Sequence, residues 1–314
     1  MVHDNIMKAA IIEEFGSPNV LKVKSIEVPK ITKDEILIKV KAASINPMDW
    51  KIRKYGFNEG YKVNFPLVLG MDIAGVIVDI DQSFPDFKLG DRVYGYIDIS
   101  RMGGYAEYVI ALPNEIACIP KGMSFNEAAS LPVAGITAMM GLFDLVNIKP
   151  NQTVLIHGAA GGVGSIAIQL AKYKKARVIG TASPYNHDFL KNLGVDKVVD
   201  YNKNWFEEID KNVDVVFDSI GGETQIKSFG LLKRNGTLIS IANPPSQYLA
   251  TKHSVNVDFV WALPSKHHLR KMNNLYMAKK LQPIVFKTFP LDNIRESHFL
   301  SETGHLRGKI IIEL

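Results

Sequence analysis

The chain has 314 residues, of which 46% are hydrophobic and 22% charged, and this length predicts about two domains of ordinary size. No apolar run approaches the ~20 residues of a membrane-spanning helix. The N-terminus lacks the apolar core of a secretory signal, and the single cysteine, Cys118, excludes an internal disulfide framework. We therefore expect a globular protein of the cytoplasm that does not associate with a membrane.

The net charge is +5, which raises the question of an acidic partner. The lysines and arginines are scattered, and their densest groups are not interleaved with aromatic residues as a platform for single-stranded nucleic acid requires. We expect these groups to be solvated faces of the protein, and we expect no nucleic-acid partner.

Residues 1–122 contain short apolar segments punctuated by glycine and proline, which predicts an antiparallel, β-rich domain. The expected strands are 8–16, 21–29, 35–45, 72–80, 90–97 and 104–111. From residue 123 to 261, apolar strands alternate with helical stretches, which is typical of a doubly wound parallel sheet. These strands are expected at 153–157, 177–182, 197–201, 213–219, 236–242 and 255–259. Residues 262–314 add a helix at 267–281 and a strand at 308–314 that is expected to pair back into the first domain.

Residues 157–172 read HGAAGGVGSIAIQLAK, a glycine cluster between the expected strand 153–157 and an apolar helix. In this context the glycines permit a tight turn, close approach to a pyrophosphate and close packing of helix on strand. Ala159 replaces the first glycine of the G-x-G-x-x-G pattern. A simple strand–helix connection is the alternative, but the alternation of strands and helices favours dinucleotide binding. No Gly-Lys-Ser/Thr follows, which excludes a Walker A loop.

The second strand of this unit ends at Thr181, Ala182 and Ser183, without the acidic residue that bonds the ribose 2′-hydroxyl of NAD. A 2′-phosphate would meet no repulsion there. It could instead be held by Ser183, Asn186 and His187, with Lys172 or Arg177 nearby. The sequence therefore favours NADP(H) as the cofactor.

The motifs GDRVYGY, GGYAEYV and AASLPVAGITA precede the glycine loop in this order. Together they resemble the zinc-independent branch of the medium-chain dehydrogenase/reductases, in particular the quinone oxidoreductase (zeta-crystallin-like) and 2-alkenal reductase groups. The resemblance implies a Rossmann sheet inserted into a GroES-like catalytic domain, a cleft between the two that holds NADPH, and a homodimer. It also implies reduction of a quinone or an α,β-unsaturated carbonyl. An NADPH-binding redox sensor or crystallin-like protein with little turnover is the alternative.

Zinc-dependent relatives carry a catalytic Cys and a His-Glu pair, where this chain has Asn46 and Met71-Asp72. With one cysteine it also lacks a four-cysteine structural lobe, and no histidine pair has a familiar ligand spacing. We therefore expect no metal and surface positions for His267, His268, His298 and His305. Tyr276 and Lys280 match the Tyr-x-x-x-Lys pair of short-chain reductases but are expected on a helix surface, and Cys118 is expected in the core.

The stretch AASINPMDWKIRKYG resembles the substrate loop of enone reductases, which implies catalytic roles for Asn46, Asp49 and Lys51. The alternatives are that Asn46 merely caps a short helix and that Lys51 is solvated. The expected cofactor-binding residues include the glycine loop, the ends of the parallel strands and a C-terminal position: Thr137, Ala160, Gly161, Gly162, Val163, Gly164, Thr181, Ser183, Asn186, His187, Tyr201, Ser219, Ile220, Ile241, Ala242 and Arg307.

Overall fold

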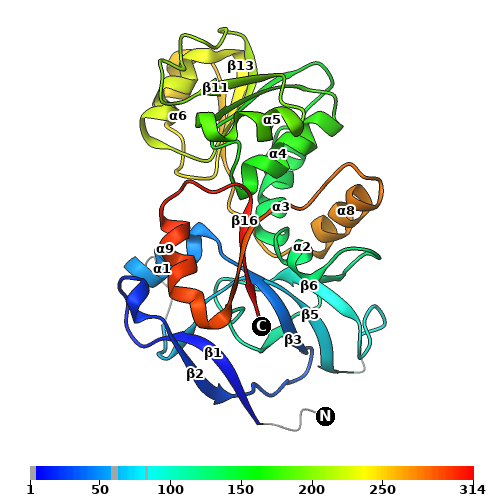
Figure 1. The fold of residues 1–314 in the computed structure, drawn as a ribbon. Helices are drawn as coiled ribbons and strands as arrows, with labels where there is room; N and C mark the ends of the chain where they lie inside the picture. Colours follow the sequence, from blue (N-terminus) through cyan, green and yellow to red (C-terminus); the bar gives the residue numbers. More distant parts are fainter. Residues whose placement is uncertain (1–4, 58–62, 82–83) are drawn as a thin grey trace. The chain divides into compact units, whose positions relative to one another are not determined.

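The structure, a computed structural model, describes residues 5–57, 63–81 and 84–314 and divides into two compact units (Figure 1). The first unit consists of residues 1–133, 263–277 and 283–314, and the second of residues 134–262 and 278–282. The sequence-based boundaries were residues 122 and 261. The first boundary falls later in the structure because helix α2 (Phe125–Ala129) packs against strands of the first unit.

The first unit is β-rich, as the sequence predicts. Its strands are β1 (Ile6–Ile12), β2 (Lys22–Glu27), β3 (Ile36–Ser44), β4 (Leu67–Val68), β5 (Asp72–Ile80), β6 (Arg92–Tyr96), β7 (Tyr108–Ala111), β8 (Ile116–Cys118), β15 (Val285–Pro290) and β16 (Lys309–Glu313). They form a three-stranded sheet in the order β2-β1-β4 and a seven-stranded sheet in the order β15-β16-β3-β5-β6-β8, with β7 paired to β3. Its other helices are α1 (Pro47–Tyr55), α8 (Lys266–Met277) and α9 (Ile294–Glu302).

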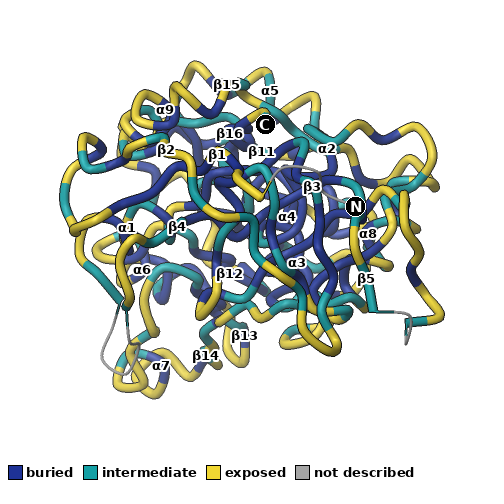
Figure 2. Tube along the Cα trace, turned by 90° about the horizontal axis from the view of Figure 1, so that it is seen from below, coloured by how far each residue is buried: buried dark blue, intermediate teal, exposed yellow. Residues whose placement is uncertain are grey.

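The C-terminal strand β16 returns to the first unit, which confirms the sequence-based expectation. It runs antiparallel to β3, with Ile311 opposite Ser44 and Ile312 opposite Ala43 (Figure 1). Strand β3 is apolar and buried over most of its length because β5, β7 and β16 all pair with it (Figure 2). The last residues of the chain are thereby placed beside the end of β3, more than two hundred residues earlier in sequence.

The second unit holds a parallel six-stranded sheet in the order β11-β10-β9-β12-β13-β14. Its strands are β9 (Thr153–Ile156), β10 (Arg177–Ala182), β11 (Lys197–Asp200), β12 (Val213–Asp218), β13 (Leu232–Ser240) and β14 (Asn256–Phe259). Its helices are α4 (Gly162–Tyr173), α5 (His187–Asn192), α6 (Gly222–Ser228) and α7 (Gln247–His253), and α3 (Pro132–Met139) leads into it. When the six strands are numbered 1 to 6 in chain order, their order across the sheet is 3-2-1-4-5-6, which is the Rossmann order. The predicted doubly wound sheet is therefore confirmed.

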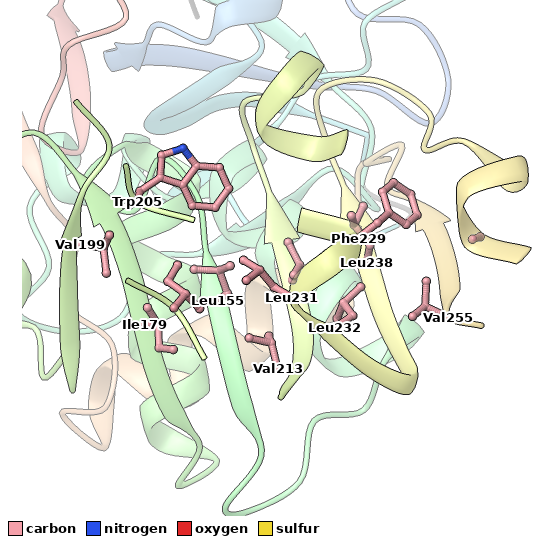
Figure 3. Close-up of a cluster of buried hydrophobic side chains, with 13 residues drawn as sticks. Leu155, Ile179, Val199, Trp205, Val213, Phe229, Leu231, Leu232, Leu238 and Val255 are labelled. Carbon is pink, nitrogen blue, oxygen red and sulfur yellow. The ribbon is translucent and has the colours of Figure 1, made fainter. Parts of the chain in front are cut away.

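A cluster of buried apolar side chains packs across this parallel sheet (Figure 3). Neighbouring strands each supply members, among them Val199, Ile179, Leu155 and Leu238, and Trp205, which follows β11, belongs to the same cluster. Strands buried on both faces explain why their sequences are continuous apolar runs rather than alternating ones. Among the described residues, no helix is both long enough and apolar enough to cross a membrane.

Candidate functional site

Asn46 lies between β3 and α1 and begins the helix. Its backbone N–H donates to the Asp49 carboxylate at 2.7 Å, and Pro47 occupies the first helical position, where its missing N–H costs no hydrogen bond. The backbone N–H of the preceding residue, Ile45, donates to the Ile310 carbonyl at 3.0 Å. This hydrogen bond fixes the connection between β3 and α1 to β16. Asn46 therefore does begin a short helix, and its side chain is directed into the first unit, only 3% exposed.

The side chain of Asn46 meets Asp72, the first residue of β5, in a buried polar cluster. Asp72 Oδ2 accepts hydrogen bonds from Ser44 Oγ at 2.8 Å, Asn46 Nδ2 at 2.9 Å and Lys309 Nζ at 3.2 Å. Its Oδ1 accepts the N–H of Val133 at 2.8 Å. Every member comes from one unit, so strand pairing within that unit assembles the cluster.

Lys309 is the cation of this cluster and lies 5% exposed at the start of β16. Its ammonium donates to Asn46 Oδ1 as well as to Asp72. The preceding residue, Gly308, has φ +72°. A Cβ added to Gly308 would collide with the Ile284 backbone oxygen and would lie 2.8 Å from the Ile284 Cβ. A side chain at residue 308 would therefore displace Lys309 from the cluster.

Asp49 is fully buried beside this cluster. Its Oδ2 accepts the Tyr105 hydroxyl at 2.7 Å as well as the Asn46 N–H, whereas no described residue donates to its Oδ1. Burial raises the pKa of Asp49 to about 7, against the opposing effect of these two hydrogen bonds. Protonated and ionised forms of this carboxyl group are therefore both populated near neutral pH.

Helices α1 and α9 bring further polar groups to Tyr105. Arg53, four residues after Asp49 and 0% exposed, pairs with Glu302 of α9. His298, one turn before Glu302, stacks edge-to-face on Tyr105 with ring centroids 5.7 Å apart. Neither ring nitrogen of His298 has a partner among the described residues, and burial lowers its pKa to about 3, with Arg53 contributing. The imidazole is therefore neutral at physiological pH.

Lys51 does not join these groups. It lies on the exposed side of α1, where its ammonium is 5.8 Å from the centre of the Trp50 ring, while the buried side of the helix carries Asp49, Ile52 and Arg53. The structure thus brings together two of the three expected catalytic residues, Asn46 and Asp49, and leaves Lys51 at the surface.

In the second unit, the glycine loop joins β9 to α4 as expected. The tight turn is made by Gly158, with φ +62°, rather than at the position of Ala159, and a Cβ on Gly158 would meet Ser219 Oγ. A Cβ on Gly164 would meet the Gly158 carbonyl and lie 2.8 Å from Ala159 Cα. No side chain caps α4 at Gly161, so its first-turn N–H groups are left for a ligand. This loop therefore suits a pyrophosphate.

The ends of β12 and β13 lie at the same carboxyl edge of the sheet. Asp218 is fully buried and accepts the N–H groups of Ile220 at 2.9 Å and Gly221 at 3.0 Å. Gln225 donates to Asp218 and to Ser240, which fixes the two strand ends relative to each other. The network presents four of the expected cofactor-binding residues at this edge: Ser219, Ile220, Ile241 and Ala242.

The end of β10 is less accessible than the sequence suggests. Thr181 is 2% exposed, and its hydroxyl lies 3.0 Å from His157 Nδ1, so its side chain is directed away from solvent. Ser183 and His187 are partly exposed, and Asn186 is 8% exposed with its amide 3.4 Å from Ser183 Oγ. These three residues remain the candidates for a 2′-phosphate.

The expectation that Lys172 or Arg177 assists at this site is wrong. Arg177 is the first residue of β10, at the opposite edge of the sheet from Ala182. Lys172 lies in the last turn of α4 and pairs with Asp196 at 2.8 Å. A helix after a parallel strand runs back toward the amino edge, so both cations are far from the carboxyl edge.

The remaining expected cofactor residues occupy separate places. Thr137 is buried in α3, Tyr201 is 41% exposed directly after β11, and Arg307 is partly exposed in the loop before β16. Arg307 belongs to the first unit and the others to the second.

Two expectations about isolated residues are wrong. His298 and His268 are buried, at 0% and 8% exposure, because the helices that carry them pack with those faces inward. Cys118 is exposed at the end of β8, and partial burial with the nearby Asp91 raises the pKa of its thiol. No group of three or more His, Cys, Asp or Glu side chains that could hold a metal ion occurs in the described ranges.

Sequence reasoning did not identify Lys309 or Tyr105 as members of the site. At the C-terminus the sequence analysis expects Arg307, two residues before Lys309, as a cofactor-binding residue. The signal for Lys309 was a lone lysine at the head of an otherwise apolar strand, KIII, expected to be buried in a sheet. A lysine is almost never buried without a partner. The pattern therefore predicts a buried carboxylate close to Lys309.

Residues 32–121 match the family described as alcohol dehydrogenase GroES-like domain, and residues 193–312 match the family described as zinc-binding dehydrogenase. The chain is similar to 2-methylene-furan-3-one reductase of Solanum lycopersicum, with 34% identity over 98% of this chain and 79% of the relative. It is also similar to the chloroplastic NADPH-dependent alkenal/one oxidoreductase of Arabidopsis thaliana, at 33% identity over 98% and 79%. The quinone oxidoreductase from Coxiella burnetii has the same fold, with a TM-score of 0.93 and 35% identity over 98% and 99% of the two chains.

Proposed function

The chain is an oxidoreductase of the zinc-independent medium-chain dehydrogenase/reductases, in the quinone and alkenal oxidoreductase group, and from this premise we propose that it delivers hydride from NADPH to a quinone or an α,β-unsaturated carbonyl. The coarser assignment, a nicotinamide-dependent enzyme, follows from the family. The cofactor supplies a hydride when bound, and the protein binds and orients it.

The observation that carries the proposal is the glycine loop. A Cβ on Gly158 or Gly164 would collide with neighbouring protein atoms, so glycine at these positions permits the tight turn and the close packing of α4 on it. The uncapped start of α4 adds N–H groups and the positive end of the helix dipole. Gly161, Gly162 and Val163 would hold the pyrophosphate, with Ser219 and Ile220 at the adjacent strand end.

The preference for NADPH rests on the end of β10. Residues 181–187 contain no carboxylate that would repel a 2′-phosphate, and Ser183, Asn186 and His187 supply polar groups there. We expect NADPH to bind much more tightly than NADH. Titration of both by quenching of tryptophan fluorescence measures this. Equal affinity, or a preference for NADH, would contradict the assignment.

Turnover is tested with a panel of enals, enones, quinones, saturated aldehydes and alcohols, followed by loss of NADPH absorbance. We expect activity with conjugated acceptors, because their developing charge needs only hydrogen-bond donors or a nearby cation. Tight NADPH binding without turnover on any acceptor would instead support the alternative, a redox sensor or crystallin-like protein.

The homodimer and the cytoplasmic location stay predictions. One similar protein, from Arabidopsis thaliana, is named as chloroplastic, so location varies among relatives. Sedimentation of the purified chain measures its oligomeric state.

A further inference from the structure

One N–H donor of the Lys309 ammonium has no acceptor among the residues that the structure describes. A lysine ammonium carries three N–H groups. Among the described residues, its acceptors are Asn46 Oδ1 and Asp72 Oδ2, which account for two of them. Lys309 is also the only buried lysine in the part of the chain that the structure describes.

The carboxylate of Asp72 is already occupied. Oδ2 accepts from Ser44, Asn46 and Lys309, and Oδ1 accepts the Val133 N–H. The Asn46 amide is fixed as well, since its oxygen accepts from Lys309 and its nitrogen donates to Asp72. Among the described residues, no third acceptor lies within hydrogen-bond distance of the Lys309 ammonium.

The exposed fractions indicate where an external molecule can reach the cluster. Ser44 and Asp72 are 0% exposed, Asn46 is 3% exposed and Lys309 is 5% exposed. Of these four side chains, only those of Asn46 and Lys309 therefore belong to residues with any exposed surface, and the Lys309 side chain is 6% exposed. Gly308 and the β16–β3 pairing fix the position of Lys309 at the start of β16.

We propose that the third N–H of Lys309 donates to the carbonyl oxygen of the acceptor and stabilises the negative charge that grows there during hydride transfer. This inference rests on the proposed function. With NADPH as the reductant, the acceptor's β-carbon would gain the hydride, the C=C electron pair would move toward oxygen to give an enolate, and NADP⁺ would be the other product. The enolate then takes a proton from water, and Lys309 keeps its own.

The competing explanation is that Lys309 only neutralises the buried Asp72. Removing one partner of a buried pair leaves an uncompensated charge, whereas removing both does not. We therefore compare Lys309→Met, Asp72→Asn, the double variant and Lys309→Arg, with Lys287→Met as control. Lys287 is an exposed lysine on the neighbouring strand β15. The double variant keeps the test possible if Lys309→Met alone fails to fold.

We expect kcat of the double variant on the best acceptor to fall about 100-fold or more, as for the loss of an oxyanion donor. The affinity of the double variant for NADPH should be unchanged. The Lys309→Arg variant should retain part of the wild-type kcat. Wild-type kcat in the double variant would show that Lys309 only balances Asp72 and would overturn the proposal. A parallel loss of NADPH affinity would also overturn it, because Lys309 would then be a cofactor ligand.

A binding measurement separates this inference from the proposed function. Para-nitrophenol imitates the enolate oxygen, and its phenolate is coloured, so absorbance reports its ionisation when bound to the protein saturated with NADP⁺. We expect the wild type and Lys287→Met to favour the phenolate and the double variant not to. Equal ionisation in all three proteins would overturn the role of Lys309, whether or not the wild type reduces any acceptor of the panel.

Discussion

Asp49 is a residue whose burial makes a measurable prediction. Its carboxyl group has a pKa of about 7 in the folded protein, because burial outweighs the hydrogen bonds from Asn46 and Tyr105. In the unfolded chain an aspartate titrates near pH ~4. Between these values the folded state binds more protons than the unfolded state. The contribution of this carboxyl group to the free energy of unfolding therefore decreases as pH rises from about 4 to about 7. The decrease is at most ~1.4 kcal/mol per pH unit.

The variant Asp49→Asn removes this dependence. Its amide oxygen can still accept from the Asn46 N–H and the Tyr105 hydroxyl. We expect the free energy of unfolding of the variant, relative to wild type, to increase with pH between about 4 and about 7 and then level off. Urea denaturation at a series of pH values measures it.

Asp188→Asn is the matched control, since that side chain is 94% exposed. Its stability difference from wild type should not follow pH in this way. A pH-independent difference for Asp49→Asn would show that the carboxyl group is ionised in the folded protein throughout this range.

At the scale of elements, the junction of β9 with α4 is the part most sensitive to an added side chain. Gly164→Val would place its Cβ against the Gly158 carbonyl and 2.8 Å from Ala159 Cα, both backbone atoms. Backbone cannot yield as a flexible side chain can, so the helix start would shift. We expect the affinities for NADPH and NADH to fall together by about tenfold or more, equivalent to ~1.4 kcal/mol, as measured by fluorescence titration.

Gly161→Ala provides the folding control for that element. Gly161 has φ −71°, and a Cβ there would lie 3.4 Å from the Gly158 backbone oxygen, which is an ordinary van der Waals contact. The Tm of the Gly161→Ala protein should therefore match that of the wild type. A folded Gly164→Val protein with undiminished NADPH affinity would show that the loop does not bind the pyrophosphate.

At the scale of the whole molecule, we predict that turnover needs no metal ion. Asn46 and Asp72 are hydrogen-bonded to the Lys309 ammonium, and the described residues hold no group of three or more metal-binding side chains. Exhaustive chelation should leave kcat on the preferred acceptor unchanged. Metal analysis of the purified protein accompanies the assay, and a loss of activity that zinc restores would contradict the prediction.

The sequence by itself determined the features whose parts lie close together in the chain. The glycine loop, its flanking strand and its helix fall within 153–173, so local spacing was enough to predict the strand, the turn and the helix. The apolar runs likewise predicted the parallel sheet, because strands buried on both faces need apolar residues throughout. Short segments punctuated by glycine and proline predicted the β-rich domain, and the motif resemblance added that this domain is GroES-like and that the parallel sheet is inserted into it.

Only the tertiary structure decided which buried charges meet. Lys309 lies 263 residues from Asn46 and 237 from Asp72, and Arg53 lies 249 from Glu302. These contacts depend on the register of β16 against β3 and on the packing of α9 near α1, which no local pattern specifies. For the same reason His298, expected at the surface, is buried against Tyr105. A buried polar group must find its partner in space, and the partner's position in sequence carries no signal of it.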